Sequence, residues 1–282
     1  MLALEPGGRP EPVTGRDLYD DPGFFARYQQ LRDAAAGLNE ALEQPSLALL
    51  LPSVTDSDVV ELGCGAGALG RRLARAGARS VLAVDAAARM LRRAVARPHP
   101  RVRYLRADIE TLDLPDGGTD LVVSSLALHY VADYQGVLAR VSRWLRPGGY
   151  LVFSCEHPIC TARDPMTGWL PLGEGSIWPV DHYDRETARV QNWLGTPVVK
   201  HHRRLSTLVG GVLAAGLDLV GLDEPQPEVG ALARRPDLEQ HCRRPPLLLI
   251  AARKPAGLGV PVSGLRRRPG RMGRRPAGTG GT

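Results

Sequence analysis

The sequence predicts an α/β fold in which a parallel sheet is covered by helices on both faces. Short runs rich in β-branched residues alternate with longer stretches of helical period, which is typical of successive βα units. The first short run, residues 58–62, leads directly into the glycine-rich segment 63–67, as strands do in nucleotide-binding sheets. The chain of 282 residues is 43% hydrophobic, so it can bury the core of one large domain.

The expected elements follow this alternation. In chain order we expect a strand at 58–62, a helix at 68–76, a strand at 80–85, a helix at 87–96, strands at 102–106 and 120–124, a helix at 134–145 and a strand at 150–154. The turn sequence Pro-Asp-Gly-Gly at 115–118 precedes the fourth strand. Arg-Pro-Gly-Gly at 146–149 is expected to reverse the chain, because proline and glycine terminate a helix.

The second half of the chain departs from this rhythm. Residues 156–200 are rich in proline, glycine and aromatic side chains, so we expect an insertion or lid there. A helix at 205–215 and strands at 217–222 and 246–252 then complete the sheet. Both ends, residues 1–16 and 255–282, are rich in proline and glycine and are expected to be disordered, which leaves 17–254 as the folded domain.

The charge of the chain is concentrated at one end. The formal net charge is +6, and the segment after Lys254 carries six arginines and no acid. The rest has 30 basic and 30 acidic residues, so we expect no nucleic acid on the core. The tail either contacts nucleic acid or an acidic partner, or is simply solvated. With no signal segment, no apolar run near ~20 residues and no regular cysteine spacing, we expect a reduced, cytoplasmic protein without membrane insertion.

The glycine-rich loop indicates a nucleotide-like cofactor. A strand that feeds such a loop and then a helix presents backbone amides to a ligand, and glycines allow its close approach. Gly63, Gly65 and Ala68 also satisfy the loose pattern of dinucleotide-binding proteins. Asp85 ends the second strand, where a carboxylate accepts hydrogen bonds from ribose hydroxyls. These two features alone leave an NAD-dependent oxidoreductase open, although the chain has no Tyr-x-x-x-Lys sequence.

Four motifs in order distinguish between these cofactors. They are Val-Val-Glu-Leu-Gly-Cys-Gly-Ala-Gly at 59–67, Ala-Val-Asp at 83–85, Arg-Ala-Asp-Ile-Glu at 106–110 and Leu-Arg-Pro-Gly-Gly at 145–149. With them, residues 17–254 resemble the class I S-adenosylmethionine (SAM) dependent methyltransferases. The resemblance implies a Rossmann-like, doubly wound sheet of seven strands whose last strand is antiparallel, with SAM as the cofactor. A non-catalytic SAM-fold module that binds RNA or a protein partner remains an alternative.

The resemblance also implies roles for individual residues. Those implied at the cofactor are Glu61, Gly63, Cys64 and Gly65 around the methionine part, Asp85 at the ribose, Asp108, Ile109 and Met90 at the adenine, and also Ala86 and Ser124. The segment from Tyr19 to Arg32 resembles a helix that closes over SAM. Tyr28 and Arg32 share one face of it, and a guanidinium matches a carboxylate. Each acid also has a capping or surface interpretation, and Met90, Tyr28 and Arg32 have core or surface ones.

The methyl acceptor is predicted less sharply than the cofactor. The loop 124–130 enters the ligand-binding edge of the sheet and lacks the (Asn/Asp)-Pro-Pro-(Tyr/Phe) sequence of amino-methylating DNA enzymes. Glu156 ends the fifth strand nearby. The candidate catalytic residues are His129, His182 and Asp181, and the candidate acceptor contacts are Tyr19, His157, Trp169, Trp178 and Tyr183. A histidine is a suitable general base, and aromatic walls suit a flat acceptor, although structural histidines and a small satellite core explain the same residues.

We therefore expect methylation of a small aromatic or heterocyclic molecule, such as an indole-containing natural product of secondary metabolism. The methylated atom is carbon, nitrogen or oxygen, and the enzyme is a monomer or a homodimer. The cluster Cys155, Glu156, His157 and Cys160 lacks the spacing of zinc ligands, so no metal is predicted.

Overall fold

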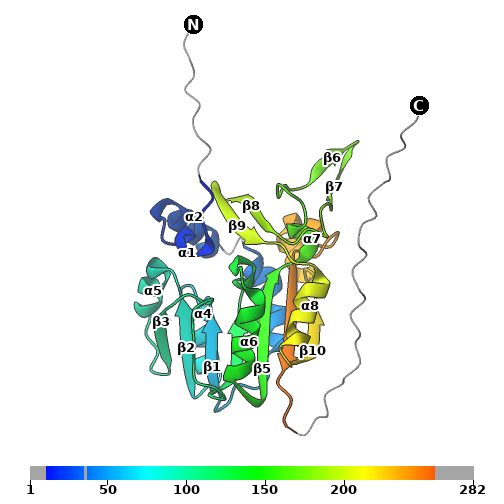
Figure 1. The fold of residues 1–282 in the computed structure, drawn as a ribbon. Coiled ribbons are helices and arrows are strands. Elements are labelled where there is room, and N and C mark those ends of the chain that lie inside the picture. Colours follow the sequence, from blue (N-terminus) through cyan, green and yellow to red (C-terminus); the bar gives the residue numbers. More distant parts are fainter. Residues whose placement is uncertain (1–10, 35–36, 258–282) are drawn as a thin grey trace, which may run out of the picture.

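The computed structural model describes residues 11–34 and 37–257, so residues 258–282 of the expected disordered tail lie outside it. Its centre is a seven-stranded sheet in the order β10-β11-β5-β4-β1-β2-β3 (Figure 1). The strands are β1 (Asp58–Leu62), β2 (Ser80–Asp85), β3 (Val102–Arg106), β4 (Thr119–Ser124), β5 (Leu145–Glu156), β10 (Asp218–Asp223) and β11 (Leu247–Arg253). β11 pairs antiparallel with both β10 and β5, and the other described pairs of this sheet are parallel, so the predicted doubly wound fold with an antiparallel last strand is confirmed.

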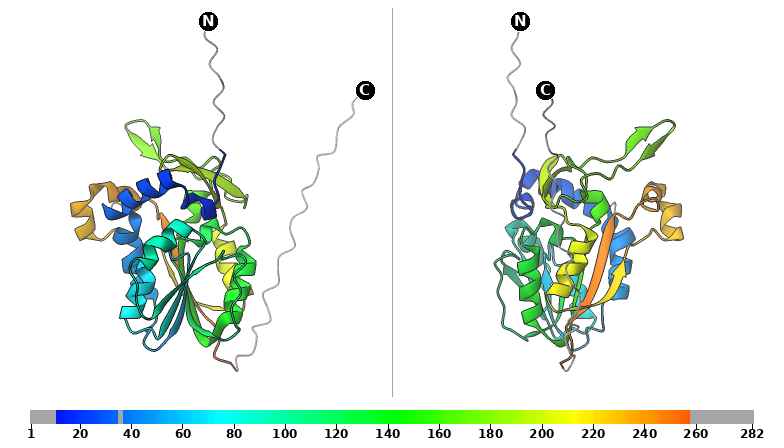
Figure 2. Two further views of the ribbon diagram at one scale, coloured as in Figure 1. Left: turned by 90° about the vertical axis from the view of Figure 1, so that its left-hand side faces the viewer. Right: turned by 45° about the vertical axis from the view of Figure 1, so that its right-hand side comes forward.

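Helices cover both faces of the sheet (Figure 2). One face packs against α3 (Gln44–Leu50), α4 (Ala68–Arg75) and α5 (Ala88–Val95), and the other against α6 (Tyr134–Trp144) and α8 (Leu205–Ala214). Leu121, Val123 and Val152 face the first layer, while Val122 and Phe153 face the second, because successive side chains of a strand alternate between faces. The strands are apolar on both sides for this reason, as expected of a sheet buried between two helical layers.

The start of β5 differs from the prediction. The strand begins at Leu145, which pairs with Thr119 of β4, and the register shifts before Leu121 pairs with Tyr150. The Arg-Pro-Gly-Gly sequence at 146–149 is therefore an irregular part of the strand rather than a turn in front of it. β5 also continues to Glu156, which carries this residue to the carboxyl end of the strand.

A further group of elements lies over the carboxyl ends of the parallel strands and forms a separate layer there (Figure 1). It contains α1 (Gly15–Leu18), α2 (Pro22–Asp33) and the hairpin of β8 (Ala188–Trp193) and β9 (Thr196–His201). Part of the expected disordered N-terminus belongs to this layer, because Val13 forms a bridge with Val198 of β9. The backbone hydrogen bonds of this bridge, 2.9 and 3.0 Å long, order residues 11–16.

The remaining short elements fill the connections. They are the π-helix Asn39–Glu43, the 3-10 helices Leu128–Tyr130 and Pro236–His241, α7 (Pro158–Thr161), α9 (Val229–Arg234) and the hairpin of β6 (Leu170–Leu172) and β7 (Gly175–Ile177). Residues 156–200, the expected lid, thus form one short helix and parts of two hairpins outside the main sheet. None of the helices in the described residues is long and apolar enough to span a membrane.

Candidate active site

The glycine loop between β1 and α4 has a backbone that few other residues adopt. Gly63 and Gly65 have φ values of +74° and +52°, in the left-handed region that favours glycine. A Cβ atom on Gly63 would lie 2.4 Å from the Cβ of Ala127, in the loop that follows β4. A Cβ on Gly65 would meet only Met90 Sδ, at 4.0 Å. The loop therefore packs closely on one side and leaves backbone open to a ligand on the other.

Asp85 stands at the end of β2 beside this loop. Its Oδ2 accepts a hydrogen bond of 2.7 Å from the amide of Gly65, and its Oδ1 accepts one of 2.8 Å from the amide of Ala87. Burial raises the pKa of Asp85 despite these two amides. Each carboxylate oxygen has a second lone pair, so Asp85 retains capacity to accept from two hydroxyl groups. The residues present thus fit a ribose placed next to the loop.

Glu61 lies below the loop, under α4. The residue is 2% exposed, and its Oε2 has no hydrogen-bond partner in the part of the chain that the structure describes. A Cβ on Gly70 of α4 would lie 2.6 Å from that oxygen. Burial raises the pKa of Glu61 to about 8, so the carboxyl group is largely protonated at neutral pH. A neutral carboxyl differs from the ionised acid that contact with the amino group of SAM would favour.

Two other residues implied at the cofactor line the same loop. Met90 is 2% exposed and faces Gly65. Ile109 places its Cδ1 3.8 Å from the Cβ position of Gly63. Cys64, between the two glycines, is buried, and burial raises the pKa of its thiol well above the usual range. Met90 of α5 and Ile109 after β3 thus place apolar groups beside the glycine loop.

Three further residues implied at the cofactor form hydrogen bonds within the fold. The Asp108 carboxylate accepts a 2.9 Å hydrogen bond from the amide of Glu110, which fixes the turn after β3. The Ser124 hydroxyl is fully buried and donates to the Leu62 carbonyl at 2.9 Å. The Ala86 carbonyl accepts from Arg106. The Ser124 hydroxyl therefore connects β4 to β1, and its proton faces the sheet.

An aromatic cluster covers the site from above. Tyr19 packs edge-on against Phe24, Tyr28, Tyr130 and Trp193, with ring centroids 5.1–6.4 Å apart. Burial, and then neighbouring phenols, raise the pKa of Tyr19, and the carboxylate of Asp85 acts on it in the same direction. The cluster combines α1, α2, β8 and the loop after β4, so distant segments form one cover over the cofactor loop.

The N-terminal segment that carries part of this cluster is bonded to the rest of the fold at Asp20 and at Arg32. The carboxylate of Asp20 accepts hydrogen bonds from the amides of Ala88 and Arg89, at 3.1 and 2.8 Å, and thereby caps α5. Arg32, expected to pair with the SAM carboxylate, forms an ion pair of 3.0 Å with Glu40. Its Nη1 is buried without a hydrogen-bond partner among the described residues, so one side of the guanidinium remains available.

Glu43 is a site residue that the sequence did not indicate. It is fully buried at the end of the π-helix, and its Oε1 accepts from the hydroxyls of Ser125 and Ser154, at 2.6 and 2.8 Å. Ser154 in turn accepts from the amide of Leu126, whose φ is +52°. Glu43 therefore holds the loop after β4 in a strained conformation. The contacts span 82 and 111 residues, and no local pattern marks them.

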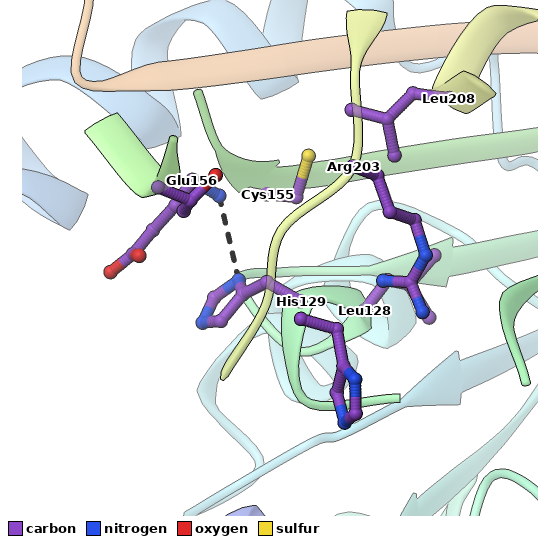
Figure 3. Close-up of a pocket in the computed structure, with 8 residues that line it drawn as sticks. Leu128, His129, Cys155, Glu156, Arg203 and Leu208 are labelled. Atoms are coloured by element: carbon purple, nitrogen blue, oxygen red, sulfur yellow. Dashed lines mark hydrogen bonds between the residues drawn. The ribbon is translucent and has the colours of Figure 1, made fainter. Parts of the chain in front are cut away.

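His129 and Glu156 meet at the ends of β4 and β5. The backbone amide of Glu156 donates to His129 Nδ1 at 3.4 Å, and both side chains point to the same side, away from Arg203 and Leu208 (Figure 3). Burial lowers the pKa of His129 to about 4, so the ring is neutral at physiological pH. A cavity of about 10 Å³ adjoins them, room for one water, lined by Leu128, His129, Cys155, Glu156, Thr161, His201, Arg203 and Leu208.

Three of the other expected residues, His182, Asp181 and His157, do not join His129. His182 and Asp181 lie between β7 and β8, and their side chains face each other at 3.8 Å. Asp181 is 72% exposed, and the His182 carbonyl accepts from Arg189. His157 Nε2 is bonded to Glu224 at 2.7 Å, so this ring points away from the loop after β4.

The structure separates the lid aromatics that we expected around one pocket. Trp169 and Trp178 pack edge-on at 5.5 Å, and Arg244 stacks over Trp178 at 3.8 Å. The Tyr183 hydroxyl accepts from the amide of Leu205 at the start of α8. Trp193, a further aromatic residue of segment 156–200, does reach the aromatic cluster, because it ends β8 and this hairpin folds over the sheet edge.

No group of three or more His, Cys, Asp and Glu side chains within residues 11–34 and 37–257 is arranged to hold a metal ion. In the cluster weighed from the sequence, Cys155 is buried in β5 and Cys160 Sγ lies 2.9 Å from Arg244.

The fold and the glycine loop define a doubly wound α/β protein that binds a nucleotide-like cofactor. A methyltransferase domain family matches residues 60–153. A SAM-dependent methyltransferase of Mesorhizobium loti is 40% identical, with a TM-score of 0.72 over 77% of this chain and 100% of that one. A putative SAM-dependent methyltransferase of Listeria monocytogenes is 34% identical, with a TM-score of 0.71 over 75% and 96%. An uncharacterized protein of Haemophilus influenzae is 31% identical over 250 residues, which cover 84% of this chain and 96% of the relative.

The chain therefore belongs to the SAM-dependent methyltransferases, and SAM is its cofactor.

Proposed function

We propose that this methyltransferase acts on a small aromatic or heterocyclic molecule, with indole-containing compounds as the first candidates. The observation that carries the proposal is the aromatic cluster closed over the cofactor loop by α1, α2 and β8. Aromatic side chains beside the cofactor loop suit contact with a flat molecule of low polarity better than contact with a macromolecule. Aromatic faces also favour the positive sulfonium.

We propose that the glycine loop holds the methionine end of SAM, with Gly63, Cys64 and Gly65 facing it. Asp85 would accept the ribose hydroxyls, because each of its oxygens has a lone pair left beside the amide that it binds. Met90 and Ile109 would contact the adenine. The proposed set of cofactor-site residues is completed by Arg32, Tyr28, Ala86, Asp108, Ser124 and Glu61. Ser124 and Glu61 would act by holding the surrounding fold in place rather than by contact with SAM.

When bound, SAM supplies a methyl group on a sulfonium that the acceptor displaces in line. The chain's own task is then to orient the acceptor and exclude water. His129 suits the first task better than that of a base. Its Nδ1 accepts from Glu156, which leaves the proton of the neutral ring on Nε2, as a donor towards the acceptor. Asp181 and His182 would reach the acceptor only if the segment between β7 and β8 moved.

Titration calorimetry with S-adenosylhomocysteine (SAH) tests the cofactor site. We expect micromolar binding by the wild type and a loss of at least about tenfold in Asp85→Ala, because two hydrogen bonds to a charged group are removed. Asp113→Ala is the matched control, since Asp113 is 68% exposed and its described partners, Arg143 and Trp144, belong to α6 rather than to the glycine loop. Equal SAH affinity in Asp85→Ala and the control would contradict the proposed role of Asp85.

A panel of acceptors with labelled SAM tests the substrate class. We expect methyl transfer to indoles or phenols and none to aliphatic acids or amines. Transfer to an aliphatic acid or amine, with none to the aromatic compounds, would refute the proposed class and leave the methyltransferase assignment intact.

A further inference from the structure

Lys200 is a buried cation at the edge of the proposed acceptor space. Its side chain is 3% exposed and forms an ion pair with Glu156 Oε1. Its ammonium group also donates to the Gln191 amide oxygen and lies 5.3 and 6.0 Å from the ring centroids of Trp193 and Tyr130. The chain uses only two lysines among its 36 basic residues. A buried ion pair seldom stabilises a fold more than apolar residues would, so its presence calls for another explanation.

The second carboxylate oxygen of Glu156 suggests a functional reason for the buried ion pair with Lys200. Glu156 Oε2 is buried and has no hydrogen-bond partner among the described residues. Burial is the largest single influence and favours the neutral acid, but the charge and hydrogen bond of Lys200, together with His129 and Arg244, outweigh it and lower the pKa of Glu156, so the group is ionised. An ionised, buried oxygen without a donor is costly, and such atoms are rare in native proteins. The site therefore requires a hydrogen-bond donor that the described chain does not supply.

Two other cations lie near this carboxylate. Arg203 donates to the carbonyls of Val131 and Ala132 and stacks on Tyr134 at 5.0 Å. Arg244 lies over Trp178 and donates from Nη1 to Cys160, while its Nε is buried without a hydrogen-bond partner among the described residues. Neither guanidinium forms a hydrogen bond with Glu156 Oε2, which remains open to a ligand in the part of the chain that the structure describes.

Glu156 is connected to the cofactor loop through the loop after β4. Glu156 ends β5, and its amide binds His129 in the loop after β4. The same loop places Ala127 against Gly63 of the glycine loop. Figure 3 shows the carboxylate of Glu156 and the ring of His129 directed to the same side, so they face one space rather than opposite ones.

We propose that Glu156 Oε2 accepts a hydrogen bond from the hydroxyl or ring N–H of the methyl acceptor, and that Lys200 and Gln191 position this carboxylate. Trp193 and Tyr130 would form aromatic walls. The Lys200–Glu156 pair is neutral as a whole, so the acceptor class is an uncharged planar molecule with an O–H or N–H donor. A carboxylate acceptor would be repelled by Glu156. This inference rests on the proposed function and names the substrate class of the same site.

Matched probes test the proposal without knowledge of the natural acceptor. Indole and benzofuran have nearly the same shape, but only indole carries an N–H; benzoate supplies a carboxylate. Ligand-observed NMR titrations would measure their affinities for the full chain saturated with SAH. We expect indole to bind the wild type about tenfold more tightly than benzofuran, and benzoate to bind more weakly than indole.

Glu156→Gln is expected to reduce the preference for indole over benzofuran to within about threefold, because an amide accepts less strongly and also donates. The double variant Glu156→Gln/Lys200→Met, which leaves no unpaired charge, should lose the preference equally. Glu174→Gln, an exposed position beside β7, is the control and should retain it. SAH affinity should stay within about threefold of the wild type in all three variants.

The outcomes separate the two levels of inference. An indole preference that persists in both Glu156 variants, tighter binding of benzoate than of indole, or no binding of indole would each overturn the proposed acceptor site, while SAH binding left the methyltransferase function standing. Failure of the wild type to bind SAH would overturn the proposed function and this inference together.

Discussion

Gly63→Ala is a direct test of the close contact between the cofactor loop and the loop after β4. At a φ of +74° an alanine costs about 1–2 kcal/mol relative to glycine, because its Cβ crowds the following carbonyl. The new Cβ would also lie 2.4 Å from Ala127 Cβ, far inside the 3.5–4.0 Å of ordinary carbon contacts, and overpacking of this kind costs about 1–3 kcal/mol. We therefore expect a loss of about 2–5 kcal/mol of unfolding free energy and weaker SAH binding.

Gly117→Ala isolates the backbone contribution. Gly117 has a φ of +63° in the turn before β4, and a Cβ there would meet nothing within 4 Å. Urea denaturation should give a loss of about 1–2 kcal/mol for this control, with SAH affinity unchanged. Equal stability and equal SAH affinity in the two variants would refute the reasoning, since the Gly63–Ala127 contact would then be of no consequence.

Three further predictions follow from buried charged groups. Because burial raises the pKa of Glu61 from 4.5 to about 8, the favourable contribution of this residue to folding stability is present below pH 4.5 and is lost as pH rises through 8. Glu61→Gln should therefore lessen the fall in stability to urea between pH 5 and 8, by an amount on the order of 4 kcal/mol. An unchanged dependence of stability on pH would contradict this. NMR titration of the His129 ring should give a midpoint near pH 4, whereas a histidine signal that titrates above pH 6 and vanishes in His129→Gln would show the burial argument to be wrong. Lys200→Met should cost about 3–5 kcal/mol by leaving Glu156 unpaired, and adding Glu156→Gln should restore part of that loss; a single variant as stable as the wild type would exclude a structural ion pair.

Local sequence was sufficient where one element dictates its own conformation. The predicted strands at 58–62, 80–85 and 102–106 coincide with β1, β2 and β3, because hydrophobic runs bounded by glycine or polar turns have few alternatives. The glycine loop and Asp85 were also evident, since their backbone and position follow from the strand–turn–helix pattern. The start of β5 was mistaken, because pairing with Thr119 of β4 overrides the turn preference of Pro-Gly-Gly.

The sequence by itself determined the fold class and the cofactor, because both depend on short motifs and on hydrophobic period. The acceptor side depended on tertiary structure. Glu43, Lys200 and Trp193 contact Ser125, Glu156 and Tyr28, which lie far from them in the chain, and only the folding of the N-terminal segment and the β8–β9 hairpin over the sheet edge brings these pairs together. Burial also sets the charge of the titratable groups in this region. It neutralises His129 and Glu61, whereas Glu156, paired with Lys200, stays ionised. The charge of these groups depends on which side chains are buried together, and no local sequence pattern indicates which ones will be.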